Sequence, residues 1–483
     1  MRTLASLLVV GLAACAAPKS DVTPPSIPLV FDALFTGATL RFDYVHCGTA
    51  QGGLVDHVAV DRFRLEGEWP GSRTQLLDPL GFGKYRFVVL DQKSGAPIWS
   101  RGFCSIYGEW ETTGEAKQAW RAFQESQRFP EPKAPVTLVL EKRAPDLSWQ
   151  ELWRGECDPS SRHVDRSPVT RRGGVMPIFE SGPPATKVDL LIVGDGYTGK
   201  QRDEFIDDVQ RLVGALFSTE PFKSRRGDFN VRALLAPSPQ PGVTDPRRGI
   251  FVDTPLKLSF NAFDTDRYML TFANDALRDW IAQAPYDTVI LLANTRKYGG
   301  GGIYNLWCTC AADTEVASYV FVHEFGHSFG GLADEYYSSQ VAYEDFTPPG
   351  TEPWEPNVTA LLDRDRCKWK ELVAEGTPIP TPWDQKSYDE MDVGYQKRRA
   401  ALLEQKADDA AVEALMRETK KTSGERLAVE PWQGKVGAFE GAAYEAKGLY
   451  RPCVDCIMFT RNPTRFCPVC ERAVARAIDS FTK

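Results

Sequence analysis

The chain has 483 residues, of which 42% are hydrophobic, which is ordinary for a globular protein of roughly two to four domains. Its 57 Lys and Arg residues stand against 65 Asp and Glu residues, which gives a formal net charge of −8. This acidic balance, without a basic block, argues against nucleic acid as a partner.

The N-terminus is predicted to be a targeting segment. Arg2 is followed by an apolar run at 4–14 that is too short to span a bilayer, and Cys15 follows the run. The last four residues, Leu-Ala-Ala-Cys, are similar to the box of bacterial lipoproteins, whose cysteine is lipidated. We expect a lipoprotein signal peptide at 1–15, lipidation at Cys15 and a proline-rich tether at 16–28. The lipid would anchor the chain in the bacterial cell envelope, with the outer membrane favoured; a plain secretory signal is the alternative.

Residues 29–165 are predicted to form an N-terminal β-sandwich domain. Turn-forming Gly and Pro clusters separate short β-rich runs at 40–44, 62–65, 85–90, 97–107 and 136–140. This part contains no catalytic constellation, and its role as a spacer, a binding module or a latch over an active site is open. Residues 166–186 are rich in Ser, Arg, Gly and Pro and are interpreted as a linker.

From residue 187 the pattern changes to strands that alternate with helices. Apolar runs at 188–193, broken only by Asp189, and at 288–293 are typical of buried strands, and another strand is predicted at 229–235. Amphipathic helices are predicted at 198–216 and 266–283. This order predicts a mainly parallel sheet with crossover helices.

Four consecutive glycines occupy positions 299–302. A phosphate loop would need Lys followed by Ser or Thr after the glycines, and that pair is missing. We interpret 299–304 as an edge strand with which an extended peptide can pair its backbone. Further on, the charged, Ala-rich stretch at about 385–425 is predicted to be a helical insertion without chemistry.

The pattern H-E-x-x-H at 323–327 is the strongest chemical signal in the chain. His323 and His327 are four residues apart, so on a helix both imidazoles face one side and can bind one zinc ion. Glu324 lies beside them and can act as the general base toward a zinc-bound water. Histidine is scarce here, with five in the chain, so two at ligand spacing are unlike a chance match.

A zinc hydrolase normally takes a third protein ligand and keeps the fourth position for water. The sequence contains no histidine after His327, so a carboxylate is expected. Asp334, just beyond a glycine turn, is the best candidate, and Glu335 and Glu440 are the alternatives.

Ten cysteines remain when Cys15 is set aside, an even number that favours disulfides in an exported protein. The last group has the spacing C-x2-C-x10-C-x2-C and consists of Cys453, Cys456, Cys467 and Cys470. This spacing fits disulfides and a second, structural zinc ion equally well.

Together these residues resemble the IgA-peptidase (igalysin) family of secreted bacterial zinc endopeptidases, which is metzincin-like. The matching segments are 188–198, 298–305, 323–336 and 436–458. The resemblance implies an α+β multidomain protein, in which the N-terminal β-sandwich is followed by a metzincin-like α/β zinc peptidase domain at 187–483 that contains the helical insertion. It also implies that Met458 forms the Met-turn beneath the metal. The sequence departs from the long metzincin motif at Ala333, where that motif has its third ligand.

The predicted function is that of an exported zinc endopeptidase that cleaves protein or peptide substrates with one catalytic zinc ion. The resemblance does not imply that immunoglobulin A is the substrate. The alternatives are a surface adhesion lipoprotein with a vestigial zinc site and a zinc amidase that acts on peptidoglycan.

Overall fold

The structure is a computed structural model that describes residues 29–338, 341–343, 347–405 and 407–483. The predicted signal peptide at 1–15, with Cys15, and the tether at 16–28 lie outside the described residues. Within the described part, no helix combines the length and the apolar character needed to cross a membrane.

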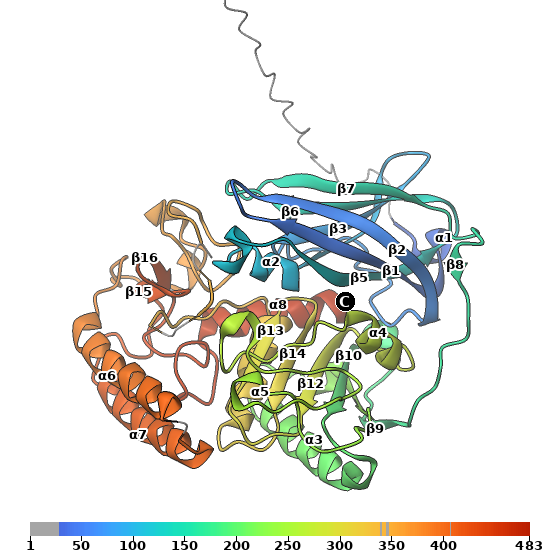
Figure 1. Ribbon diagram of the computed structural model, residues 1–483. Helices are drawn as coiled ribbons and strands as arrows, with labels where there is room; N and C mark the ends of the chain where they lie inside the picture. Colours follow the sequence, from blue (N-terminus) through green and yellow to red (C-terminus); the bar gives the residue numbers. More distant parts are fainter. Residues whose placement is uncertain (1–28, 339–340, 344–346, 406) are drawn as a thin grey trace, which may run out of the picture.

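The N-terminal part forms two four-stranded sheets, as Figure 1 shows. One has the order β5-β1-β2-β8 and consists of β1 (Phe35–Thr49), β2 (Val55–Glu68), β5 (Arg121–Pro132) and β8 (Val164–Asp165). The other has the order β4-β3-β6-β7 and consists of β3 (Tyr85–Asp91), β4 (Pro97–Phe103), β6 (Val136–Arg143) and β7 (Trp149–Cys157). Phe42 on β1 and Phe87 on β3 stack with their ring centroids 6.2 Å apart, so the two sheets share one core. Two short helices belong to this part, α1 (Phe31–Leu34) and α2 (Ile106–Trp110).

The second part is built on a six-stranded sheet with the order β13-β14-β12-β10-β11-β9. Its strands are β9 (Val175–Phe179), β10 (Val188–Asp195), β11 (Phe229–Leu235), β12 (Thr288–Ala293), β13 (Gly300–Ile303) and β14 (Trp307–Ala311). The four inner strands are parallel, and the edge strands β9 and β13 are antiparallel to their neighbours. The mainly parallel sheet predicted from the sequence is therefore present.

Alternate residues of the central strand β10 enter two different cores. Leu190 and Ile192 pack with α3 (Arg202–Leu216), α5 (Ala317–Ser328) and α8 (Pro468–Thr482). Leu191 and Val193 pack with α4 (Asn274–Ile281) and with α2 of the N-terminal part. Because both faces are covered, most residues of the strand are apolar, with the buried Asp189 and Asp195 as the charged exceptions.

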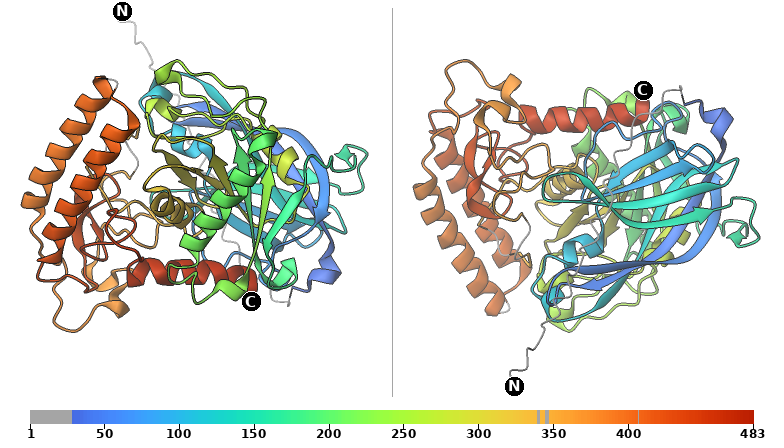
Figure 2. Two further views of the ribbon diagram at one scale, coloured as in Figure 1. Left: turned by 90° about the horizontal axis from the view of Figure 1, so that it is seen from below. Right: turned by 90° about the horizontal axis from the view of Figure 1, so that it is seen from above.

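The charged segment after residue 384 forms a pair of neighbouring helices, α6 (Gln385–Glu404) and α7 (Asp409–Ala428), beside the sheet (Figure 2). Arg398 and Glu418 join the two helices through ion-pair contacts of 2.6 Å. A two-stranded hairpin follows, made of β15 (Phe439–Ala442) and β16 (Glu445–Arg451).

Three expectations are corrected by the structure. The helix predicted at 266–283 begins at Asn274, because the preceding residues run extended along β13, where Met269 N donates to Gly300 O. The predicted linker is not wholly irregular, since β9 lies within it and pairs with β11; its Pro177 is tolerated because β9 is an edge strand. The ten described cysteines are free thiols rather than disulfides in this structure.

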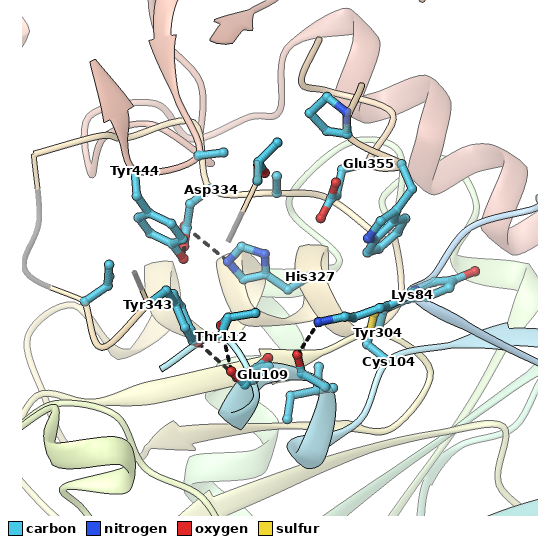
Figure 3. Close-up of a pocket in the computed structure, with 18 of the residues that line it drawn as sticks. Lys84, Cys104, Glu109, Thr112, Tyr304, His327, Asp334, Tyr343, Glu355 and Tyr444 are labelled. Atoms are coloured by element: carbon cyan, nitrogen blue, oxygen red, sulfur yellow. Dashed lines mark hydrogen bonds and ion pairs between the residues drawn. The ribbon is translucent and has the colours of Figure 1, made fainter. Parts of the chain in front are cut away.

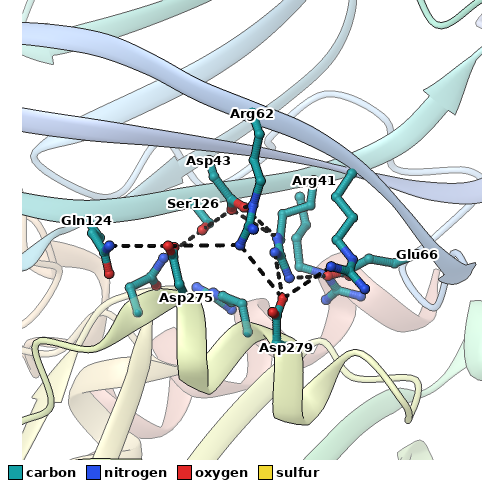
Figure 4. A network of polar contacts seen from close by, with 12 residues as sticks. Arg41, Asp43, Arg62, Glu66, Gln124, Ser126, Asp275 and Asp279 are labelled. Atoms are coloured by element: carbon teal, nitrogen blue, oxygen red, sulfur yellow. Dashed lines mark hydrogen bonds and ion pairs between the residues drawn. The ribbon is translucent and has the colours of Figure 1, made fainter. Parts of the chain in front are cut away.

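Charged side chains join the N-terminal sheets to helix α4, as Figure 4 shows. The guanidinium of Arg41 is fully buried and contacts Asp43, Glu66 and, across the boundary, Asp279, each at 2.9 Å. Asn274 at the start of α4 donates to Ser126 Oγ at 2.7 Å. These contacts fix the two parts relative to one another.

Candidate active site

Helix α5 carries the H-E-x-x-H residues and is held from below by apolar packing. Phe325 and Phe329 stack at 5.0 Å, and Phe325 contacts Phe222 at 5.4 Å. The chain turns just beyond the helix at Gly331, whose φ of +65° suits glycine. This turn returns the chain toward the helix and brings Asp334 opposite the two histidines.

Three side chains converge at one point above α5: His323, His327 and Asp334. The two Nε2 atoms are 3.1 Å apart, and Asp334 Oδ1 lies 3.1 Å from that of His323 and 3.2 Å from that of His327. Ligand atoms around a tetrahedral zinc ion are about 3.3 Å apart when the bonds are about 2.0 Å long. The three atoms therefore have the spacing of one face of a tetrahedral metal site.

Each histidine is oriented by a backbone carbonyl on its other nitrogen. His323 Nδ1 lies 3.0 Å from Ile457 O, and His327 Nδ1 lies 2.6 Å from Leu332 O. A carbonyl only accepts, so both Nδ1 atoms donate, and a neutral imidazole then directs its Nε2 lone pair at the cluster. This is the tautomer that a metal requires.

Asp334 is buried, and only one of its two carboxylate oxygens accepts a hydrogen bond from a described residue. Its Oδ2 accepts from the Tyr444 hydroxyl at 2.5 Å, while Oδ1 has no hydrogen-bond donor among the described residues. Despite burial, the two histidines hold the pKa of Asp334 well below its ordinary value, and Asp334 raises the pKa of His327 to about 9. The donor set of two imidazoles and a carboxylate, with this orphaned oxygen, fits a divalent zinc ion.

Glu324 lies one residue after the first histidine and faces the same cavity. Burial raises the pKa of its carboxyl above the ordinary value. A raised pKa suits a group that must both accept and return a proton near neutral pH.

The two alternative third ligands point elsewhere. Glu335 is fully buried and turns away toward Cys456, Cys467 and Cys470. Glu440 pairs with Lys447 at 3.0 Å and is outside the histidine cluster.

Met458 packs against helix α5. A Cβ at Gly326 would be 3.1 Å from its sulfur, so the thioether directly contacts the helix that carries both histidines. The Met458 carbonyl also accepts from Glu335 N at 2.8 Å, which ties this turn to the segment that carries Asp334.

The cluster opens into a cavity of about 470 Å³, shown in Figure 3. Its walls come from both parts of the chain. Lys84 and Glu109 enter it from the N-terminal sheets and α2, and Tyr343 from the irregular segment after α5. Tyr268 and Tyr343 donate to Glu109, and burial nevertheless raises the pKa of Glu109 to about 7.

Edge strand β13 lines the cavity, but most of its outer edge is occupied. The alternation of the antiparallel ladder turns Gly300 and Gly302 away from β14. Gly300 is already bonded to Arg267 O and Met269 N, and Tyr304 O accepts from Cys104 N. The predicted substrate edge at 299–304 is therefore narrowed to the backbone of Gly302.

A smaller cavity of about 90 Å³ adjoins the first at His323 and Glu324. Its other walls include Arg267, Arg399 from α6 and Arg461. Sequence reasoning assigned no chemistry to α6, and nothing in its local pattern indicates that it borders an active site. Tyr444 and Glu109 were also missed, because each reaches the site through a tertiary contact.

Comparison with known families gives two matches, and comparison with curated proteins gives none. Residues 30–154 match the Peptidase M64 N-terminus, and residues 176–478, more than half of the chain, match IgA Peptidase M64. The second match contains every residue of the histidine cluster. The chain therefore belongs to the IgA peptidase M64 family and is a metallopeptidase that hydrolyses peptide bonds.

Proposed function

We propose that the chain is a zinc-dependent endopeptidase whose metal is held by His323, His327 and Asp334. The observation that carries the proposal is the spacing of 3.1 Å and 3.2 Å between their inward-facing atoms at the cavity. When bound there, zinc supplies a Lewis acid that polarises a peptide carbonyl and lowers the pKa of water toward about 7.

Glu324 is the general acid and base of the proposed reaction. Its carboxylate accepts a proton from the attacking water as the water oxygen bonds to the carbonyl carbon. It then donates the proton to the amide nitrogen, so that the C–N bond breaks and a neutral amine leaves. The raised pKa of Glu324 supports this two-way role.

The substrate is an extended segment of a protein that lies across the cavity mouth. Gly302 pairs with Cys308 but directs its own N–H and C=O away from β14, and the described residues show no backbone hydrogen bond to them; this supports a short strand-like contact with the substrate backbone. Lys84 and Glu109 line the same cavity from the N-terminal part, so this part takes part in substrate selection rather than acting as a spacer.

The architecture is proposed to be metzincin-like, with Met458 in the role of the Met-turn residue. Its packing against Gly326, beneath the helix that bears both histidines, supports this role. The departure at Ala333 is accommodated because the ligand position falls one residue later, on Asp334.

We propose that the protein is exported and anchored by a lipid on Cys15. The Leu-Ala-Ala-Cys sequence supports this. Replacement Cys15→Ser should abolish labelling by a radioactive or clickable fatty acid in the producing bacterium, and a labelled variant would refute the anchor.

The peptidase reading is tested with the full chain and denatured casein. Glu324→Gln should lower kcat/KM by about 10²–10⁴ and keep the catalytic zinc ion. His323→Ala should lose the activity and the catalytic zinc ion together. Glu390→Gln, an exposed change on α6, serves as the control. Casein cleavage by Glu324→Gln at the wild-type rate would refute the mechanism, and release of fragments from purified cell wall but not from casein would favour the amidase.

A further inference from the structure

A second group of potential metal ligands lies behind the active site. It consists of four buried side chains, each with one ligand atom within 4.8 Å of the others: Glu335, Cys456, Cys467 and Cys470. We call this group the Glu335 cluster. It comes from three places in the chain: the segment after α5, the turn that contains Met458, and the start of α8.

The distances in the cluster are those of ligands that share an ion. Cys456 Sγ and Cys470 Sγ are 3.8 Å apart, and Cys470 Sγ lies 3.2 Å from Glu335 Oε1. Two sulfurs bound to one tetrahedral zinc ion with bonds of about 2.3 Å are about 3.8 Å apart. A disulfide would bring them to about 2.05 Å.

The cluster is not the four-cysteine set that the sequence spacing suggests. Cys453 is buried and interacts with Cys467, but it is outside the mutually close group. Glu335 takes the fourth position. The carboxylate reaches it because Glu335 directly follows Asp334 on the segment that turns back over α5.

Burial leaves the carboxylate of Glu335 without a full set of partners. The side chain is 0% exposed; Oε1 accepts from Asn357 Nδ2 at 3.0 Å, and Oε2 has no hydrogen-bond donor among the described residues. The guanidinium of Arg451 is also buried, but it donates to the carbonyls of Glu440 and Gly441. A buried carboxylate oxygen without a hydrogen-bond donor is destabilised, and a bound cation would compensate its charge.

One sulfur of the cluster is held in position by the backbone. Cys456 Sγ accepts the backbone N–H of Cys467 at 3.2 Å. This hydrogen bond orients the sulfur toward the other members of the cluster.

We propose that the Glu335 cluster binds a second, structural zinc ion. This ion would hold in place Asp334, the third ligand of the proposed catalytic zinc. Four protein ligands close the coordination shell, so the site has no position for water or substrate. The ion would join Glu335, which directly follows Asp334, to Cys456. Ile457 comes directly after Cys456, and its carbonyl orients His323.

Zinc binding at the Glu335 cluster is independent of the proposed function. The proposed effect of this ion on Asp334 rests on the proposed function. Zinc per chain is measured on the full chain by elemental analysis for wild type, Cys467→Ser, His323→Ala and Cys453→Ser. We expect about two equivalents in wild type and Cys453→Ser, and about one in each of the other two.

His323→Ala separates the two hypotheses, because it removes the catalytic ligand and should keep the second ion even though activity is lost. One equivalent in wild type and none in His323→Ala would overturn the second site. Loss of zinc in Cys453→Ser would overturn the assignment of Glu335 as fourth ligand.

A second measurement keeps the proposal testable if Cys467→Ser does not fold. Wild-type protein is stripped and reconstituted with cobalt(II), and thiolate-to-cobalt charge-transfer absorption is recorded. The band should be present in wild type and in His323→Ala, because histidine and carboxylate ligands do not produce it. Absence of the band, or a Cys456–Cys470 disulfide found by thiol counting under denaturing conditions, would overturn the proposal.

Discussion

Asp334 shows how much the proposed metal site depends on groups that would not touch the metal. One of its oxygens faces the two histidines and the other accepts from Tyr444 at 2.5 Å. The backbone adds two bonds to the same hairpin, from Ala443 N to Asp334 O and from Tyr444 N to Tyr336 O. The carboxylate is thus oriented by the β15–β16 turn before a metal arrives.

Removal of the Tyr444 hydroxyl should therefore weaken zinc binding without disturbing the fold. For Tyr444→Phe we expect the zinc Kd to rise about 10–100-fold, because Asp334 loses the donor that fixes its rotamer. Chelator competition on metal-free protein measures the change. Tyr450→Phe, in strand β16 of the same hairpin, is the matched control, and equal affinities in the two variants would contradict the orienting role.

At the scale of the element, strand β13 packs against helix α5 too closely at Gly302 for a residue with a side chain. A Cβ on Gly302 would lie 2.5 Å from Glu324 O and 2.8 Å from His327 Cβ. A Cβ on Gly301 would meet the ring of Tyr268 at 2.3 Å on the opposite face. Close packing on both faces of this edge strand therefore explains the run of glycines. The flexibility that glycine gives to a loop is not needed to explain it.

Gly302→Ala should push β13 away from α5. We expect the free energy of unfolding to fall by about 1–3 kcal/mol and kcat/KM to fall by about tenfold or more, since Glu324 and His327, which would be displaced, carry the proposed chemistry. Gly214→Ala in α3 is the control: its Cβ meets nothing within 4 Å, so stability should rise by about 0.5–1 kcal/mol at unchanged activity. Full activity of Gly302→Ala would show that the contact between β13 and α5 has room for a methyl group.

Local patterns predicted the elements whose environment is uniform. Strands β10, β11 and β12 lie between two apolar layers, so most of their residues are apolar, although β11 includes Asn230 and Arg232. The histidine spacing follows from one helix. Strand β5 was missed because its polar residues are buried against other polar groups, as where Arg128 donates to Glu66 at 2.9 Å and to Tyr286 O. Tyr444 is 110 residues from Asp334 and joins it only through the tertiary fold.

At the scale of the whole molecule, the active-site cavity exists only because the two parts of the chain are joined. Arg41 and Asp279 bridge the boundary on one side, and on the other Cys104 N donates to Tyr304 O at 2.9 Å. Asn305 Nδ2 donates to Gly102 O at 2.7 Å next to that contact. The β4–α2 region is therefore held against the end of β13, where it places Glu109 opposite the metal cluster.

This placement predicts a pH-dependent preference for substrate charge. The pKa of Glu109 is raised to about 7, chiefly by burial, so its carboxyl is mostly neutral at pH 6 and mostly ionised at pH 8. The cavity gains a negative charge over that interval, facing Lys84 and His327. Peptides with a basic residue at the position that contacts Glu109 should gain about three- to tenfold in kcat/KM over otherwise identical acidic peptides between pH 6 and pH 8.

The ratio of kcat/KM for the basic and the acidic peptide is the quantity to measure, because the titration of Glu324 and of the metal ligands cancels from it. Glu109→Gln should make the ratio independent of pH, whereas Glu156→Gln, an exposed change on β7, should leave the pH dependence as in wild type. A pH-dependent ratio that survives in Glu109→Gln would place the titrating group elsewhere. A ratio that is flat in wild type would mean that substrates do not reach the wall formed by the N-terminal part, which would return that part to the role of a scaffold.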